Sequence, residues 1–86
     1  MLPLSQHAVF EMERREIGED EVGLVLHSPE QKIKLVSGRE IWQNKMQMQK
    51  DGKMYVLRVI VELVPKLKIV TVYKSSKVKK YWREDA

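Results

Sequence analysis

Three side chains near the start of the chain combine an imidazole, a carboxylate and a guanidinium. If this stretch is a helix, His7, Glu11 and Arg15 fall at i, i+4 and i+8 and form a single row. An imidazole transfers protons near neutral pH, a carboxylate can orient it, and a guanidinium can hold a phosphate. The same row is also typical of an ordinary solvated helix face, in which Arg15 simply pairs with Glu11. Its meaning depends on the elements that position it.

The composition favours one small globular domain. The chain has 86 residues, of which 43% are hydrophobic and 33% charged, and its formal net charge is +4. It has no cysteine, no apolar run long enough to span a bilayer and no signal-peptide pattern, so we expect a cytoplasmic protein with no membrane partner. Acidic residues gather between Glu11 and Glu21 and basic residues near the C-terminus, which indicates a polyanionic partner such as nucleic acid.

The first third of the chain predicts two helices. The first is expected to begin at Leu4 or Ser5 and to run to about Glu16. The second has Gly18 as its N-cap, acidic residues in its first turn and Glu21 at the capping-box position, and Ser28-Pro29 ends it.

From residue 32 the hydrophobic period changes to two, which predicts strands. We expect four, over 32–36, 39–49, 53–63 and 67–74, joined at Ser37-Gly38, Asp51-Gly52 and Pro65-Lys66. The predicted fold is therefore α+β, within a single domain of residues 1–86. Two N-terminal helices (4–29) pack on one face of a four-stranded antiparallel meander (32–74), and a basic C-terminal tail follows (75–86).

A two-residue turn at Asp51-Gly52 would fix the register of the central hairpin. The predicted pairs are Lys50 with Lys53, Met48 with Tyr55, Met46 with Leu57, Asn44 with Val59 and Trp42 with Val61. Because side chains alternate along strands, one face then carries the core beneath the helices: Ile33, Trp42, Met46, Leu57, Val59, Val61, Val70 and Val72.

The opposite face of the predicted sheet is more polar. It carries Gln43, Lys45, Gln47, Val56, Arg58, Ile60, Glu62, Ile69, Thr71 and Tyr73. In this register Lys45 lies across from Arg58, and Arg58 lies across from Tyr73. Opposed cations repel. One explanation for this pairing is that the face binds a phosphate backbone, and the other is that it is a solvated face of long polar side chains.

Several motifs, in order along nearly the whole chain, resemble a small bacterial and phage family of unknown function. They are His7-Ala8, Arg15 and Ile17, the acidic second helix ending near Pro29, and the last strand reading Val70-Thr71-Val72-Tyr73. That family is similar to RelE-type and BrnT-type toxins and to barnase-like and colicin ribonucleases. The resemblance implies an α+β fold and metal-independent RNA cleavage. The family commonly has a basic residue where this chain has Glu11, and this departure puts the catalytic role in doubt.

Metal-free RNA cleavage needs a proton-transfer group and cations that stabilise charge on phosphorus. On this hypothesis His7 is the general acid or base, and Glu11 orients it and raises its pKa. Arg15 and Arg58 would hold the phosphate, and Tyr73 would donate a hydrogen bond or stack on a base. His7 approaches the polar face only if the first helix begins at the sheet edge, beside the last strand.

A second group of residues is suited to binding nucleic acid without cleaving it. The candidates are the cations and one hydroxyl of the polar face and tail: Lys45, Thr71, Lys74, Lys77, Lys79, Lys80 and Arg83. Equally, Tyr81 and Trp82 could dock a short helix onto the body of the protein.

Three classes of function remain open. The first is a metal-independent ribonuclease, with RNA as substrate and an antitoxin protein as partner. The second is a non-catalytic nucleic-acid-binding module, and the third is a small protein-interaction domain. No cofactor is expected, and no metal site either, because His7 and Glu11 have no evident third ligand.

Overall fold

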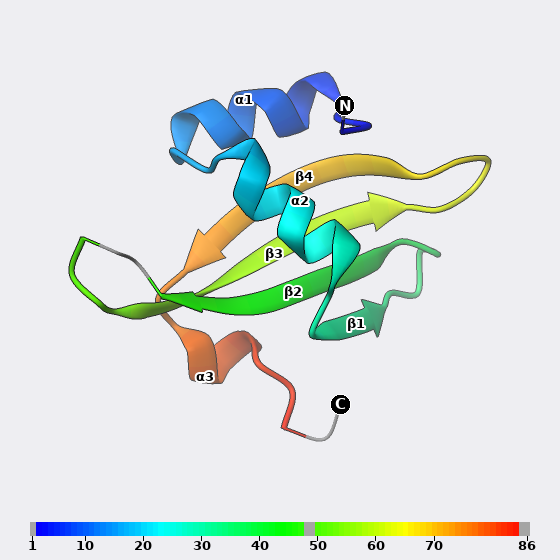
Figure 1. The fold of residues 1–86 in the computed structure, drawn as a ribbon. Helices are drawn as coiled ribbons and strands as arrows, with labels where there is room; N and C mark the ends of the chain where they lie inside the picture. Colours follow the sequence, from blue (N-terminus) through cyan, green and yellow to red (C-terminus); the bar gives the residue numbers. More distant parts are fainter. Residues whose placement is uncertain (1, 48–49, 85–86) are drawn as a thin grey trace.

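The computed structural model of the chain describes residues 2–47 and 50–84 and confirms an α+β fold (Figure 1). Four strands form one antiparallel sheet in the order β1-β2-β3-β4, so each strand pairs with the next along the chain. The elements are α1 (Gln6–Arg14), α2 (Glu19–His27), β1 (Gln31–Lys34), β2 (Glu40–Gln47), β3 (Met54–Glu62), β4 (Lys68–Ser75) and α3 (Val78–Tyr81).

The first helix begins after Ser5, one of its two expected starts, and the second begins after its predicted cap, Gly18. The Ser5 hydroxyl accepts a hydrogen bond from the backbone N–H of Ala8 at 3.0 Å. The backbone N–H of Gly18 donates to Oε1 of Glu21 at 3.0 Å, which is the expected capping-box contact. The first helix ends at Arg14, slightly before the predicted end, and Glu16 turns the chain with a φ of 55°.

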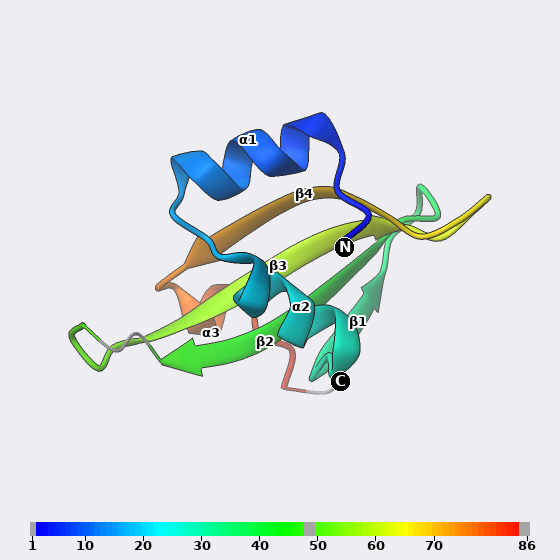
Figure 2. The same ribbon diagram turned by 45° about the horizontal axis from the view of Figure 1, so that its top comes forward.

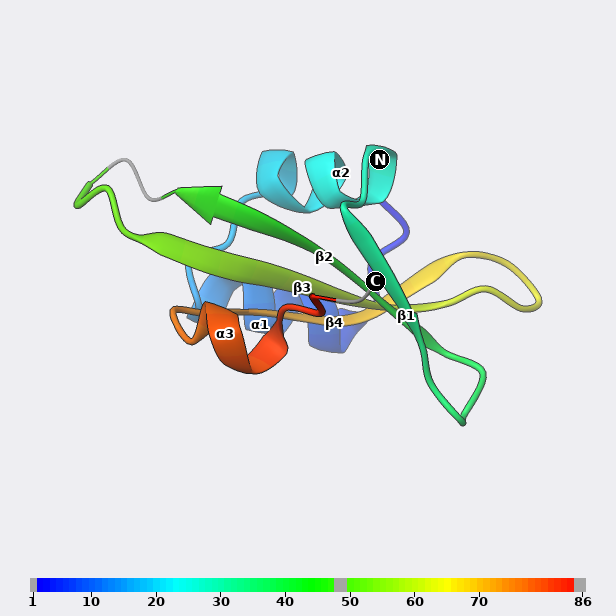
Figure 3. The same cartoon turned by 90° about the horizontal axis from the view of Figure 1, so that it is seen from below.

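The helices α2 and α3 lie on opposite faces of the sheet. Seen from below, α2 covers one face and α3 lies against the other (Figure 3). The first helix runs alongside β4 at the edge of the sheet (Figure 2). Ala8, Met12, Val22 and Val25 of α1 and α2 join the core with the buried strand residues Trp42, Tyr55, Leu57, Val59, Val61, Ile69 and Val72.

The predicted register of the central hairpin is wrong by two residues. Trp42 pairs with Val59 and Asn44 with Leu57, and the ladder closes at Gln47 and Met54. The connection is longer than two residues. Of the two expected turn residues, Gly52 has a positive φ and Asp51 does not, whereas a type I′ turn needs a positive φ at both. A shift of two keeps each side chain on its predicted face. Lys45 consequently lies across from Val56, not Arg58; the predicted pairing of Met48 falls outside the described residues.

Three side chains depart from their predicted positions in the sheet. A bulge between Ile60 and Val61 shifts the pairing with β4, so Ile69 is fully buried in the core and Val70 is only half-buried. Ile33 pairs with Ile41. It therefore faces away from the helices, and its neighbour Lys32 lies over the ring of Trp42.

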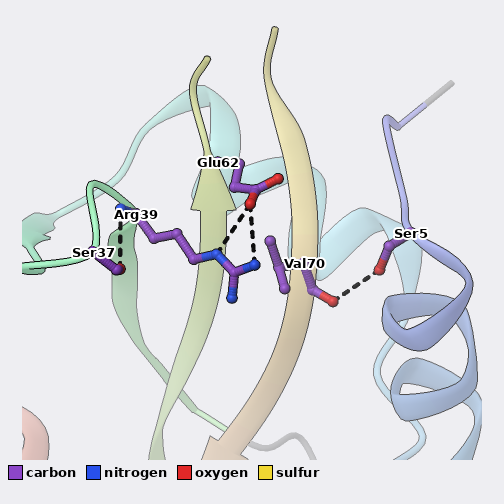
Figure 4. A network of polar contacts seen from close by, with 5 residues as sticks. All are labelled: Ser5, Ser37, Arg39, Glu62 and Val70. Atoms are coloured by element: carbon purple, nitrogen blue, oxygen red, sulfur yellow. Dashed lines mark hydrogen bonds and ion pairs between the residues drawn. The ribbon is translucent and has the colours of Figure 1, made fainter. Parts of the chain in front are cut away.

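The chain just before α1 is attached to the outer edge of β4. Leu4 forms a parallel bridge with Ile69: Ser5 N–H donates to the Ile69 carbonyl at 3.0 Å, and Ile69 N–H to the Pro3 carbonyl at 2.8 Å. The Ser5 hydroxyl also donates to the Val70 carbonyl at 2.8 Å (Figure 4). The first helix therefore begins at the sheet edge, beside the last strand. Among the described helices, none has the length and apolar character needed to cross a membrane.

Candidate nucleic-acid interface

The row of chemical groups on α1 is divided between an ion-pair cluster and an exposed histidine. Oε2 of Glu11 accepts hydrogen bonds from Nε of Arg15 at 2.7 Å and from Nη2 of Arg14 at 2.9 Å. The hydrogen bond from Arg15, helped by Arg14, lowers the pKa of Glu11. His7 is exposed and forms no side-chain hydrogen bond or ion pair within the described residues. The carboxylate thus pairs with the arginines instead of orienting His7.

Arg58 is buried on the sheet face that lies away from α2. Only 8% of it is exposed. Its Nε donates to Oε1 of Gln43 at 2.8 Å, its Nη1 donates to the hydroxyl of Tyr73, and its guanidinium lies 4.5 Å from the ring centroid of Tyr81. Tyr73 is paired with Arg58 as predicted, and its ring makes an edge contact with Tyr81 at 6.0 Å. The structure thus brings Arg58 and Tyr73 together. Their polar groups bind each other, and both side chains lie against Tyr81.

The C-terminal segment, residues 76–84, is docked on this face. The Gln43 side chain donates to the Tyr81 carbonyl at 3.0 Å and to Oε1 of Gln31 at 2.7 Å. Gln31 in turn exchanges hydrogen bonds with the backbone N–H and carbonyl of Arg83. The short helix α3 is therefore fixed to the sheet by the buried amide side chains of Gln31 and Gln43. This agrees with the alternative in which Tyr81 and Trp82 dock a short helix onto the body of the protein.

The remaining candidates on this face are dispersed. Lys45 Nζ lies 4.4 Å from the ring centroid of Trp82, and Thr71 is half-buried in β4 opposite Ile60. Arg83 is exposed, while its backbone is bound to Gln31. The polar face that the sequence predicts as an open binding surface is thus largely covered by the chain's own C-terminal segment.

A lysine-rich groove lies at the end of the sheet where β3 begins and β4 ends. Two hollows, of about 550 and 340 Å³, share Met54 and Ser76. They lie where the β2–β3 connection approaches the link from β4 to α3, at the same end of the sheet (Figure 1). We call this feature the lysine groove; its cations are Lys53, Lys74, Lys77, Lys79 and Lys80.

The lysine groove is strongly positive. Its one acidic lining residue is Asp51, whose side chain accepts a hydrogen bond from the backbone N–H of Lys53. Within residues 2–47 and 50–84 the ion pairs all lie elsewhere, at Glu11 and between Arg39 and Glu62 (Figure 4). The five ammonium groups therefore have no ion-pair partner in the described part of the chain.

Tyr55 separates the lysine groove from the core. Its ring is buried and lies 5.5 Å from Nζ of Lys74, and its hydroxyl donates to Oε2 of Glu21 at 2.5 Å, at the start of α2. Burial, together with this hydrogen bond, raises the pKa of Tyr55 well above its ordinary value. The floor of the groove is thus fixed to the helical layer.

Four of the five groove lysines are among the nucleic-acid-binding residues predicted from the sequence. Lys74, Lys77, Lys79 and Lys80 line the groove as predicted cations, whereas Lys53 lines it without having been predicted. The topology offers a signal for Lys53: in a meander, the β2–β3 connection and the end of β4 must lie at the same end of the sheet.

No potential metal-binding group of three or more His, Cys, Asp and Glu residues occurs in the part of the chain that the structure describes. The resemblance to ribonuclease toxins stays a prediction, since no family model, no curated protein and no solved structure matches this chain.

Proposed function

We propose that this protein binds nucleic acid through its phosphodiester backbone at the lysine groove, without cleaving it. The observation that carries the proposal is the gathering of Lys53, Lys74, Lys77, Lys79 and Lys80 around two adjoining hollows, without ion-pair partners in the described chain. Like charges repel, so such a cluster lowers the stability of the free protein. A phosphate backbone supplies the compensating charge and releases its own counterions on binding.

The geometry gives less support to cleavage. His7 lies on α1 and forms no polar contact, within residues 2–47 and 50–84, with Arg15, Arg58 or Tyr73. Arg58 is buried and donates to Gln43 and Tyr73. A general acid or base acts within hydrogen-bond reach of the reacting group, where the cations that stabilise the developing charge must also gather. Binding therefore accounts for more of the arrangement than catalysis does.

Titration of a fluorescent single-stranded RNA at several salt concentrations tests this proposal. For single strands, the slope of log K against log salt is about −0.7 for each phosphate neutralised, so five contacts give roughly −3.5. We expect the variant Lys77→Gln/Lys79→Gln to bind more weakly and to reduce the magnitude of the slope by about 1.4.

The matched control is Lys32→Gln/Lys34→Gln, which removes two exposed charges from β1. If both double variants weaken binding equally, net charge and not the groove is responsible, and the proposal fails. The same RNA incubated without divalent ions should remain intact. Cleavage that disappears in His7→Ala would instead establish the ribonuclease.

A further inference from the structure

A turn at the other end of the sheet exposes apolar side chains beside two cations. The connection from β3 to β4, residues 63–67, carries Leu63 and Val64, and Val64 is 84% exposed. Lys66 and Lys68 follow, both exposed and neither in an ion pair within the described residues. Exposed apolar residues ringed by charge commonly mark an interaction site.

A second feature has the complementary character. A groove of about 210 Å³ lies between α1 and the start of α2, lined by the apolar side chains of Leu4, Val9, Met12 and Ile17. Its polar lining is acidic, from Glu13 and Glu19, and both carboxylates are exposed. Neither glutamate has an ion-pair partner in the described chain, in contrast to Glu11. We call this hollow the helix groove.

The turn and the helix groove belong to one continuous surface. Leu4 lines the helix groove and also a hollow of about 450 Å³ beneath the turn, together with Pro65, Leu67 and Lys68. A basic apolar projection and an acidic apolar recess therefore lie side by side. When two copies of such a surface meet about a two-fold axis, each projection faces the other copy's recess.

We propose that this surface binds a second copy of the chain, forming a symmetric dimer. The Leu63–Val64 turn of each copy packs into the helix groove of the other, and Lys66 and Lys68 face Glu13 and Glu19 across the interface. The charges fix the orientation of the two copies, and burial of Val64 supplies apolar contact. This inference is independent of nucleic-acid binding, because the lysine groove lies at the opposite end of the sheet.

Sedimentation equilibrium over a wide concentration range tests the dimer. We expect concentration-dependent dimerisation of the wild-type chain and at least a tenfold loss of affinity in Val64→Asp. The matched control is Val36→Asp, because Val36 is an exposed valine in the β1–β2 connection at this end of the sheet, outside the Leu63–Val64 turn. It should dimerise like the wild type. A wild-type chain that stays monomeric, or equal effects of the two substitutions, would overturn the proposal.

A charge exchange tests the two-fold arrangement separately. Glu13→Lys and Lys66→Glu should each weaken the dimer, and the chain carrying both should recover most of the lost affinity, since the exchanged pair attracts again. A double variant that dimerises no better than the single variants would overturn this arrangement. All these positions are exposed, and an unchanged circular dichroism spectrum at low concentration verifies the fold of each variant.

Discussion

Removing the ring of Tyr81 measures how the C-terminal segment is held on the sheet. In Tyr81→Ala the Arg58 guanidinium loses an aromatic partner at 4.5 Å, a contact worth about 0.5–2 kcal/mol depending on its desolvation. The edge contact with Tyr73 adds about 0.5–1.5 kcal/mol. Because such terms are not strictly additive, we expect a total loss of about 2 kcal/mol in the free energy of unfolding.

Urea unfolding followed by circular dichroism is a suitable assay. For a small domain the dependence on urea is about 1–3 kcal/mol per molar, so the midpoint should fall by roughly 1 M. The variant Tyr81→Phe is the control, since it keeps the ring and the Tyr81 hydroxyl forms no hydrogen bond in the described structure. Its unfolding free energy should stay within about 0.5 kcal/mol of the wild-type value.

Two results would refute this reasoning. If Tyr81→Ala has the wild-type midpoint, the ring does not hold the segment, and the amide contacts of Gln31 and Gln43 are sufficient. If Tyr81→Phe is as unstable as Tyr81→Ala, the hydroxyl and not the ring is responsible. A further readout is the affinity for RNA, which should fall in Tyr81→Ala although every groove lysine remains, because α3 and its N-cap residue Lys77 together carry three of them.

Three other predictions concern single contacts. Arg15 lowers the pKa of Glu11, so this pair stabilises the fold above the ordinary value of 4.5 and the contribution is lost at lower pH; between about pH 6 and pH 3, thermal unfolding should shift less in Glu11→Gln than in the wild type. The pKa of Tyr55 is raised, so wild-type stability should decline as the pH rises above its ordinary value of 10.0, and Tyr55→Phe, measured by alkaline denaturation, should lack this decline. Asn44→Ala removes the partners of two backbone groups between α2 and β1 and should lower the unfolding free energy by about 2 kcal/mol, measured by urea denaturation.

The predictable parts of the fold depend on local rules. Ser5 and Gly18 are caps because of residues within the next turn of helix, so a few letters suffice to find them. The predicted register of β2 against β3 was wrong because the prediction depended on one assumed turn length. Hydrophobic alternation could not detect the error, since a shift of two residues preserves the faces.

The candidate site was harder to predict because its contacts are distant in the sequence. Gln31 and Arg83 are hydrogen-bonded although many residues separate them, and no short motif announces such a pair. The segment that they fix is rich in lysine, a composition that is also typical of a solvated tail. Sequence patterns could therefore name the cations of the tail, whereas the docking that sets where they point required the structure. Their role in binding stays a prediction.

The bridge between Leu4 and Ile69 has a consequence for self-aggregation. An outer strand with free backbone groups can template the addition of foreign strands, which is how amyloid grows. Here the N-terminal residues already occupy backbone groups on the border of β4. The other border, β1, is only four residues long and presents the exposed charges of Lys32 and Lys34. The two borders of the sheet thus resist polymerisation by different means: one is partly filled by the chain's own backbone, and the other is too short and too charged to extend.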